Sequence, residues 1–277
     1  MIVGHQHSAF SRTPYYVLTG GLAIIFLFPL LWSFYASISP QAMTAQSEGF
    51  GFGNYRTMFE FGAGLPTVAF NSAVISILTV AITLVVSTLG GYAFARFKFW
   101  GKDALFLLTL SILMVPYATL LIPLYVMLNA LGLSNSLVGV AMMIAMFQLP
   151  FATYMMRISF ESVPRELEES AHIDGCSTFG VLWRIMLPSV TPGLVTVGLF
   201  AFLAAWNDFF APLILLTDPT KQPLPVAVAN LRQQTMGVIN YGATEAGVVV
   251  MALPCVLLFL LLQRYYVRGF MAGAIKG

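Results

Sequence analysis

The chain has 277 residues, of which 58% are apolar and 9% are charged, and its mean hydropathy is +0.85. Soluble domains carry about 25% charged residues, so this composition excludes a soluble protein and predicts an integral membrane protein. The formal net charge of +2 gives no reason to expect a nucleic-acid partner.

Six stretches of the chain are long and apolar enough to cross a bilayer. A spanning helix needs about 20 mostly apolar residues, whereas a membrane barrel needs alternating segments of about 10 residues, which this sequence lacks. We therefore expect an all-α integral membrane protein with six transmembrane helices. They are predicted at residues 15–38, 67–94, 104–128, 137–158, 193–216 and 247–267.

Two parts are expected along the chain. Residues 1–66 are interpreted as an N-terminal segment with a peripheral first transmembrane helix and a glycine-rich external loop, because glycine at the density of residues 48–54 interrupts helices. Residues 67–277 are expected to form a five-helix core. The first apolar run is too long for the core of a cleaved signal peptide.

Lysine and arginine residues predict the orientation of this plan. Ten of the 13 lie on one side of the six predicted helices and three on the other. Because cytoplasmic loops carry the excess of positive charge, both termini are expected in the cytoplasm. The long loops at 39–66 and 217–246 are then expected outside.

Glycine and proline mark two of the predicted helices. Gly90 and Gly91 allow the second helix to pack closely against a neighbour. Pro116 and Pro123 remove backbone donors and are expected to kink the third helix, which then faces a cavity or other helices rather than lipid.

A polar segment at about 162–192 separates the fourth and fifth predicted helices. Ser162 is interpreted as a helix cap before a run of acids, Gly175 ends that helix, and Ser177 caps a second one. This pattern predicts a helix-turn-helix at the membrane surface. On periodicity alone, an ordinary interfacial amphipathic hairpin is the alternative.

The same segment resembles the EAA loop of binding-protein-dependent ABC importers. Ser170 stands where the second small residue is usually alanine. The positions that match the family's spacing are Glu169, Ser170, Ala171, Gly175, Ile185, Leu187 and Pro188.

Further segments resemble the smaller permease subunit of carbohydrate importers of the maltose-transporter class. They include residues 54–55, 71–72, 93–96 and 205–208 and the tail at 263–277. The resemblance implies a type I ABC importer permease fold in the inner or plasma membrane of a prokaryote. It also implies that the EAA loop is a cytoplasmic coupling helix, with contact to the ATPase through Glu169, Ala171, Asp174 and Gly175.

The implied partners are a second permease subunit in a heterodimer, two copies of a cytoplasmic ABC ATPase, an extracytoplasmic sugar-binding protein and membrane lipid. The chain contains no P-loop of the form Gly, four residues, Gly-Lys-Ser/Thr. ATP and Mg are therefore expected on the partner ATPase. No catalytic residues, cofactor or metal site are expected on this chain, and its cargo is expected to be an oligosaccharide, a disaccharide or a related sugar.

Polar residues within the predicted helices are candidates for the translocation path. Intramembrane ionisable groups are costly and often functional, although interhelical hydrogen bonding is the more common role of polar groups. An ion-coupled secondary transporter that uses Asp208 is the alternative function, but such a carrier has no use for the polar segment. The candidates are Asn71, Tyr125, Gln148, Trp206, Asn207 and Asp208.

Overall fold

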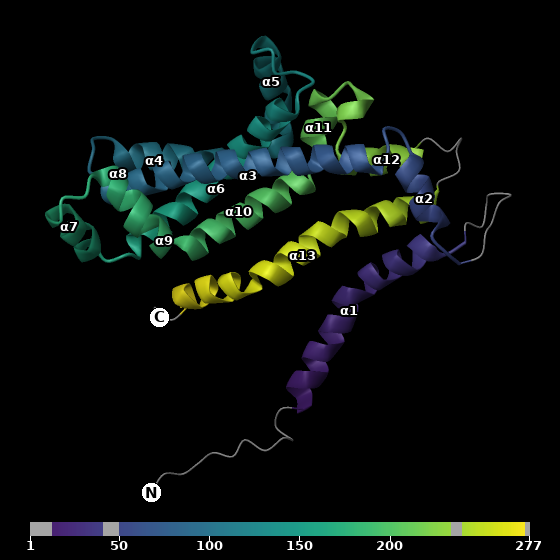
Figure 1. Cartoon of the computed structure of the whole chain (residues 1–277), viewed down its shortest axis with the longest axis horizontal. Helices are drawn as coiled ribbons and strands as arrows, with labels where there is room; N and C mark the ends of the chain where they lie inside the picture. The colour runs from purple at the N-terminus through teal and green to yellow at the C-terminus, as the bar shows by residue number, and fades with distance from the viewer. Residues whose placement is uncertain (1–12, 41–49, 234–239, 275–277) are drawn as a thin grey trace, which may run out of the picture. The chain divides into compact units, whose positions relative to one another are not determined.

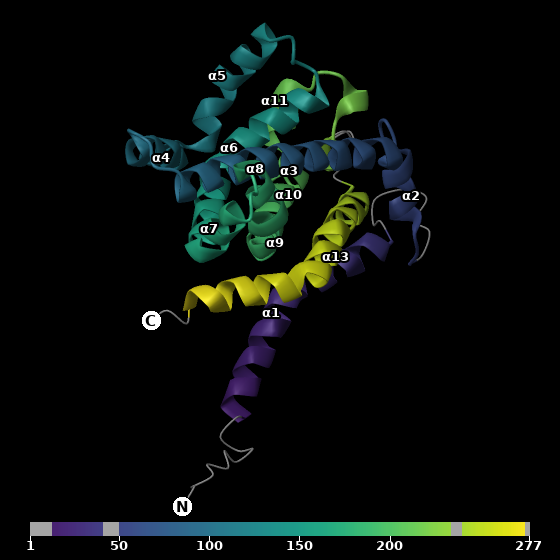
Figure 2. The same ribbon diagram turned by 60° about the vertical axis from the view of Figure 1, so that its left-hand side comes forward.

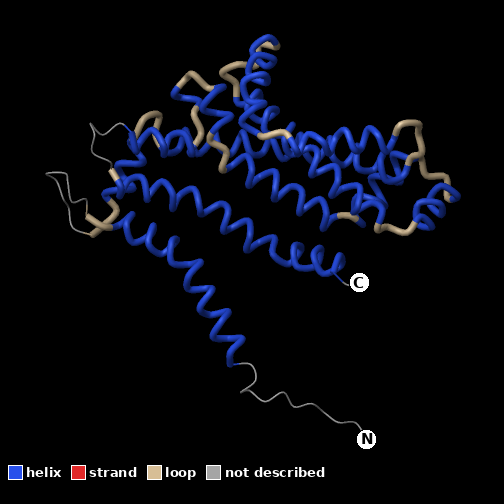
Figure 3. Tube along the Cα trace, turned by 180° about the vertical axis from the view of Figure 1, so that it is seen from behind, coloured by secondary structure: helices blue, strands red, loops and turns tan. Residues whose placement is uncertain are grey.

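The computed structural model describes residues 13–40, 50–233 and 240–274, and these residues form helices and loops without a strand (Figure 3). The predicted all-α class is thus confirmed. The longer elements are α1 Thr13–Ile38, α2 Gly53–Glu60, α3 Leu65–Arg96, α4 Lys102–Ser111, α5 Tyr117–Ala130, α6 Leu137–Glu161, α7 Arg165–Ile173, α10 Thr191–Trp206, α11 Phe210–Leu215, α12 Leu224–Gln233 and α13 Tyr241–Ala274. Between α7 and α10 lie α8 Thr178–Val181, a π-helical turn Leu182–Met186 and α9 Leu187–Ser189.

Four described helices, α1, α3, α6 and α13, are long and apolar enough to cross a membrane. Two further spans are bent. Lys102–Met114 and Tyr117–Ala130 meet at 107°, and Thr178–Ser189 and Thr191–Trp206 meet at 79°. If each bent pair is one span, the described residues hold up to six by length and composition. The second pair, however, takes in residues 178–189 of the predicted polar segment rather than residues 207–216, so the count of six stays a prediction.

Three predicted elements need correction. The third span does not merely kink but breaks at Val115, because Pro116 forces its predecessor into an extended conformation. The fifth span is interrupted at residues 207–209 between α10 and α11. The predicted external loop at 217–246 contains α12, whose Leu224 and Val226 are fully buried.

The described chain divides into two compact units. Residues 13–40, 50–60, 228–233 and 240–250 form one, and residues 61–227 and 251–274 form the other. The predicted boundary at residue 66 stays a prediction.

In the smaller unit, Asn54 on α2 donates to the carbonyls of Ser37 and Ser39 at 2.9 and 3.0 Å. These two bonds hold α2 against the end of α1.

In the larger unit, α3 packs along both α6 and α10 (Figures 1 and 2). The helices approach closely at Gly91, where an added Cβ would lie 2.5 Å from Met156 Cβ and 2.9 Å from the Arg157 amide nitrogen. The seam also buries hydroxyl side chains, and Thr79 donates to the Ala141 carbonyl of α6 at 3.3 Å. In lipid, burial of apolar surface gives no driving force between helices. Small residues favour such contacts because they let the two backbones approach closely.

Two groups of short elements extend from this packed unit. The α7, α8 and α9 elements lie at one end of it, and α5 and α11 lie on one side of α3 (Figures 1 and 2). They position two candidate sites: the hairpin between α6 and α10, and a cavity at the breaks of the two interrupted helices.

Gly91→Ala is expected to lower stability and Gly90→Ala is not. The Gly91 methyl group would overlap α6, and such overpacking costs about 1–3 kcal/mol. At Gly90 the nearest atom is Thr153 Cγ2 at 3.5 Å, an ordinary contact. The test is the unfolding midpoint of both variants in mild detergent; equal midpoints would contradict the close approach.

Candidate functional site

The first helix of the hairpin starts at a proline rather than at a serine cap. Pro164 precedes α7, and Glu166 and Glu168 lie in its first turn, where the helix dipole favours acids. Ser162 was expected to cap this helix, but its hydroxyl donates to the Ser159 carbonyl at 2.7 Å in the last turn of α6. The predicted Ser162 cap is therefore wrong.

Gly175 ends α7 as the sequence predicts. Its φ of +83° lies in the left-handed region. The Gly175 amide donates to the His172 carbonyl at 3.0 Å and the Cys176 amide to the Ala171 carbonyl at 2.9 Å. These two bonds form a Schellman motif, which satisfies the last carbonyls of the helix and favours glycine at this position.

The second half of the hairpin packs inward. Ser177 Oγ accepts the Gly180 amide at 3.2 Å, which confirms the predicted cap of the short α8. Val181, Leu182 and Met186 are buried with Ala171 in one apolar cluster that also contains Tyr92 of α3 and Phe160 of α6. The hairpin is thus packed against the spanning helices rather than lying free in an interface.

The outer face of the hairpin mixes acids with large apolar groups. Of the predicted coupling positions, Glu169, Ser170, Asp174, Gly175 and Pro188 are exposed, Ile185 and Leu187 are half-buried and Ala171 is buried. Ile173 is 86% exposed, and Phe179 and Trp183 are also exposed, with ring centroids 6.0 Å apart. The coupling role of these positions stays a prediction.

An ion pair that the sequence analysis missed joins α7 to α3. Arg96 Nε lies 3.2 Å from Glu168 Oε2, and the two side chains are 5% and 14% exposed. The Tyr92 hydroxyl donates to the other oxygen, Glu168 Oε1. The available signal was the spacing of Tyr92 and Arg96, which are four residues apart and therefore share a face of α3.

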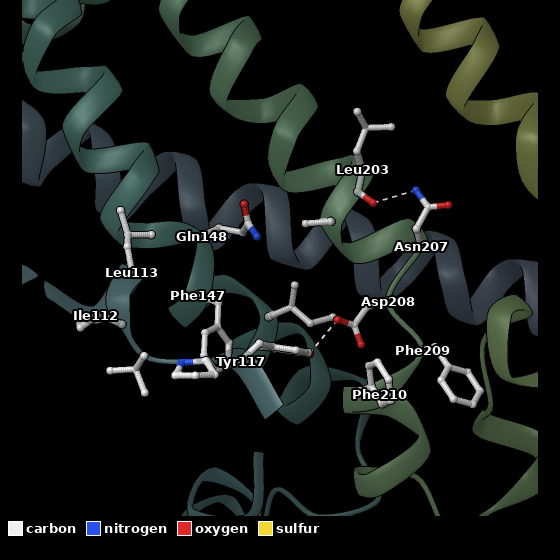
Figure 4. A pocket seen from close by; sticks show the side chains of 14 residues that line it. Ile112, Leu113, Tyr117, Phe147, Gln148, Leu203, Asn207, Asp208, Phe209 and Phe210 are labelled. Atoms are coloured by element: carbon white, nitrogen blue, oxygen red, sulfur yellow. Dashed lines mark hydrogen bonds between the residues drawn. The ribbon is translucent and has the colours of Figure 1, made fainter. Parts of the chain in front are cut away.

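A cavity of about 610 Å³ lies at the breaks of the two interrupted helices (Figure 4). The breaks bring together aromatic rings, two amides and one carboxylate. The residues that line the cavity are Ile112, Leu113, Val115, Pro116, Tyr117, Ile144, Phe147, Gln148, Leu203, Ala204, Asn207, Asp208, Phe209 and Phe210.

One carboxylate connects both breaks. The Tyr117 hydroxyl, at the start of α5, donates to Asp208 Oδ2 at 2.7 Å. Asp208 Oδ1 accepts the Ala211 amide at 2.8 Å in the first turn of α11. Asn207 donates to the Leu203 carbonyl at 2.8 Å, and Gln148 extends from α6 beside them.

The other three path candidates lie away from the lining of this cavity. Trp206 is buried and its Nε1 donates to the Met251 carbonyl at 2.9 Å. Asn71 donates to the carbonyls of Thr220 and Gln222 and so holds the segment before α12. Tyr125 packs against an apolar cluster of α5, α6 and α11. A role of these three in transport stays a prediction, whereas Tyr117, which lines the cavity, was missed.

Residues 87–271 match the family described as binding-protein-dependent transport system inner membrane component. The chain is 36% identical over 214 residues to the probable ABC transporter permease protein YurM of Bacillus subtilis, covering 77% of this chain and 71% of that protein. It is 31% identical over 277 residues to the sulfoquinovosyl glycerol transport system permease protein SmoH of Agrobacterium fabrum, covering 98% and 96%.

The fold matches a chain in a crystal structure of a bacterial ABC transporter for import of the acidic polysaccharide alginate. The TM-score is 0.76 at 22% identity, over 96% of this chain and 100% of that chain.

Gly175→Val is expected to loosen the end of α7, while Gly175→Asn is not. A β-branched residue in the left-handed region is strained by about 1–2 kcal/mol, whereas asparagine tolerates that region. Open space surrounds the position, so the strain comes from the backbone alone. The measurement is hydrogen exchange of the Cys176 amide, which should be faster in Gly175→Val than in Gly175→Asn. Similar exchange rates in both variants would contradict the Schellman motif.

Asp208→Ala is expected to destabilise the chain more than Asp208→Asn. Alanine leaves the Ala211 amide and the Tyr117 hydroxyl without their acceptor, at about 1–3 kcal/mol for each buried group. Asparagine retains one acceptor oxygen. Unfolding midpoints of the two variants in detergent test this, and equal losses would show that the charge, not the hydrogen bonds, stabilises the breaks.

Proposed function

Because the chain belongs to the family of binding-protein-dependent transport system inner membrane components, we propose that it is one permease subunit of an ATP-driven carbohydrate importer. In this role it forms half of the translocation path and transmits the action of a separate ATPase. The observation that supports this most is the family match over residues 87–271, which includes the hairpin and the Asp208 cavity. The alternative of an ion-coupled carrier gains no support from the relatives.

The outer face of the α7–α8 hairpin is proposed as the surface that docks on the ATPase. Its exposed Ile173, Phe179 and Trp183 are large apolar groups that a partner cleft would cover. Glu169 and Asp174 add outward-facing charge, which favours a specific register. The buried Ala171 would contribute by letting α7 pack closely on the core, and ATP and Mg would be bound and used by the partner alone.

This assignment sets an orientation and a set of partners. The hairpin and both termini would lie in the cytoplasm of a prokaryotic cell, in agreement with the excess of lysine and arginine on that side of the sequence. A second permease subunit would complete the path as a heterodimer. Two ATPase copies would act from the cytoplasm, and an external binding protein would deliver the sugar.

The Asp208 cavity is proposed as this chain's part of the path. A carboxylate and the amides of Gln148 and Asn207 offer hydrogen bonds to sugar hydroxyls, and the rings of Tyr117 and Phe147 offer apolar faces to a sugar ring. The relative SmoH is named for a sugar-containing substrate, which supports a carbohydrate cargo of this chemical class.

Glu169→Lys is expected to weaken ATPase recovery with the tagged chain by roughly tenfold, equivalent to about 1.4 kcal/mol, and to lower ATP-driven uptake correspondingly. Asp103→Lys is the matched control, because it reverses an exposed acid in the first turn of α4, outside the hairpin. Both variants are purified from native membranes and assayed in proteoliposomes. Unchanged recovery and uptake would refute the docking surface, and ATP-independent uptake by the lone chain would favour the carrier.

A further inference from the structure

Two adjacent acids of α7, about 100° apart around the helix axis, have different surroundings. Glu169 is exposed on the outer face, whereas the side chain of Glu168 is 14% exposed and turned toward α3. We infer that Tyr92, Arg96 and Glu168 form an internal clamp that fixes α7 to the spanning helices, leaving Glu169 for the partner. This inference rests on the proposed function, in which α7 receives the movement of the ATPase.

Both carboxylate oxygens of Glu168 face side chains of α3. One carboxylate oxygen accepts from the Tyr92 hydroxyl and the other lies 3.2 Å from Arg96 Nε. The Tyr92 ring is itself fixed by edge contacts with Phe97 and Phe160, at centroid distances of 5.6 and 5.4 Å. Glu168 therefore meets a phenol donor and a cation that α3 holds in place, and Arg96 Nε makes its contact as an ion pair without a hydrogen bond.

Arg96 extends the clamp to a third helix. Its terminal nitrogen Nη2 donates to the Phe160 carbonyl at 2.9 Å and to the Val163 carbonyl at 2.7 Å. Phe160 belongs to the last turn of α6, where carbonyls lack intrahelical partners and the dipole favours a cation. A single guanidinium thus joins α3, the end of α6 and α7, and lysine cannot reproduce its planar set of donors.

The backbone of α7 has little other attachment to the spanning helices. Among the described elements it packs mainly on α8 and the π-helical turn, which belong to the same hairpin. Ala171 adds only a methyl group to the shared apolar cluster. The clamp is therefore the direct attachment of α7 to α3 and α6, while the second half of the hairpin packs on the same helices through Val181, Leu182 and Met186. A rigid-body displacement of α7 reaches the spanning helices by both routes.

The clamp has a distinctive functional consequence. Loss of the outer face would release the ATPase, whereas loss of the clamp would leave the ATPase bound to a hairpin whose α7 has lost its direct attachment to α3 and α6. Clamp variants are thus expected to hydrolyse ATP in the assembled complex while transporting less sugar per ATP. A merely destabilising change would lower both activities together.

The test compares Glu168→Gln and Tyr92→Phe with Glu166→Gln in the complete reconstituted importer. Glu166 is an exposed acid two residues away on the same helix. For Glu168→Gln we expect ATPase recovery to be retained and sugar transported per ATP to fall by roughly five- to tenfold, within the usual range of coupling between sites. Glu166→Gln should match the unaltered chain, and Tyr92→Phe, which keeps the ring and the ion pair, should give a smaller fall.

A distance measurement gives a second readout that does not depend on transport. Spin labels are placed at the exposed positions Arg165 on α7 and Leu89 on α3, after replacement of the free Cys176 and Cys255 by serine. Glu168→Gln should broaden the distribution of distances between the labels, and Glu166→Gln should not.

The outcomes separate the two proposals. An unchanged sugar-to-ATP ratio and distance distribution in Glu168→Gln would overturn the clamp while leaving the importer assignment intact. Parallel loss of hydrolysis and transport would also overturn it, in favour of a structural role. If the unaltered chain recovers no ATPase, the proposed function itself fails.

Discussion

The close approach of α3 to α6 at Gly91 is the constraint on which the larger unit depends. Lipid provides no hydrophobic force between helices, so their association requires backbones near enough for dispersion contacts and hydrogen bonds. Met156 of α6 contacts Gly91 of α3. Because of this contact, the neighbouring Tyr92 and Arg96, one turn later, lie against the end of α6. A wider crossing would withdraw the guanidinium from the Phe160 carbonyl, and a lost hydrogen bond to a charged group costs about 1.5–3 kcal/mol.

The hairpin and the cavity are connected by the helices that build both. Helix α6 lines the cavity with Phe147 and Gln148 and reaches the clamp at Phe160, about 18 Å further along at 1.5 Å per residue. Helix α10 follows the hairpin directly and ends beside Asp208. Because helices are stiff over three or four turns, a shift of the hairpin would reorient the polar end of the cavity without any change in secondary structure.

Sequence reasoning identified most of the apolar spans, the helix-turn-helix and the end of its first helix at Gly175, because span length, charge and left-handed glycine have local signatures. It did not locate the breaks at Val115 and at residues 207–209, since a proline indicates interruption but not a bend angle. It also did not separate Glu168 from Glu169 or prefer Tyr117 to Tyr125. Those distinctions depend on how each helix is rotated about its axis. On α3 the buried hydroxyl residues recur every three or four positions, and this signal of its packed face was not used.

The bond between Tyr117 and Asp208 ties two helix breaks together, and this has a kinetic consequence. Any rearrangement that parts α5 from α11 must first separate a phenol from a carboxylate, and a lost hydrogen bond to a charged group costs about 1.5–3 kcal/mol. An activation barrier raised by that amount slows the rearrangement by roughly ten- to hundredfold. In the proposed role of this cavity, a sugar hydroxyl, itself a donor, would replace the phenol on Asp208 as it leaves, so arriving cargo would accelerate the opening that an empty cavity resists.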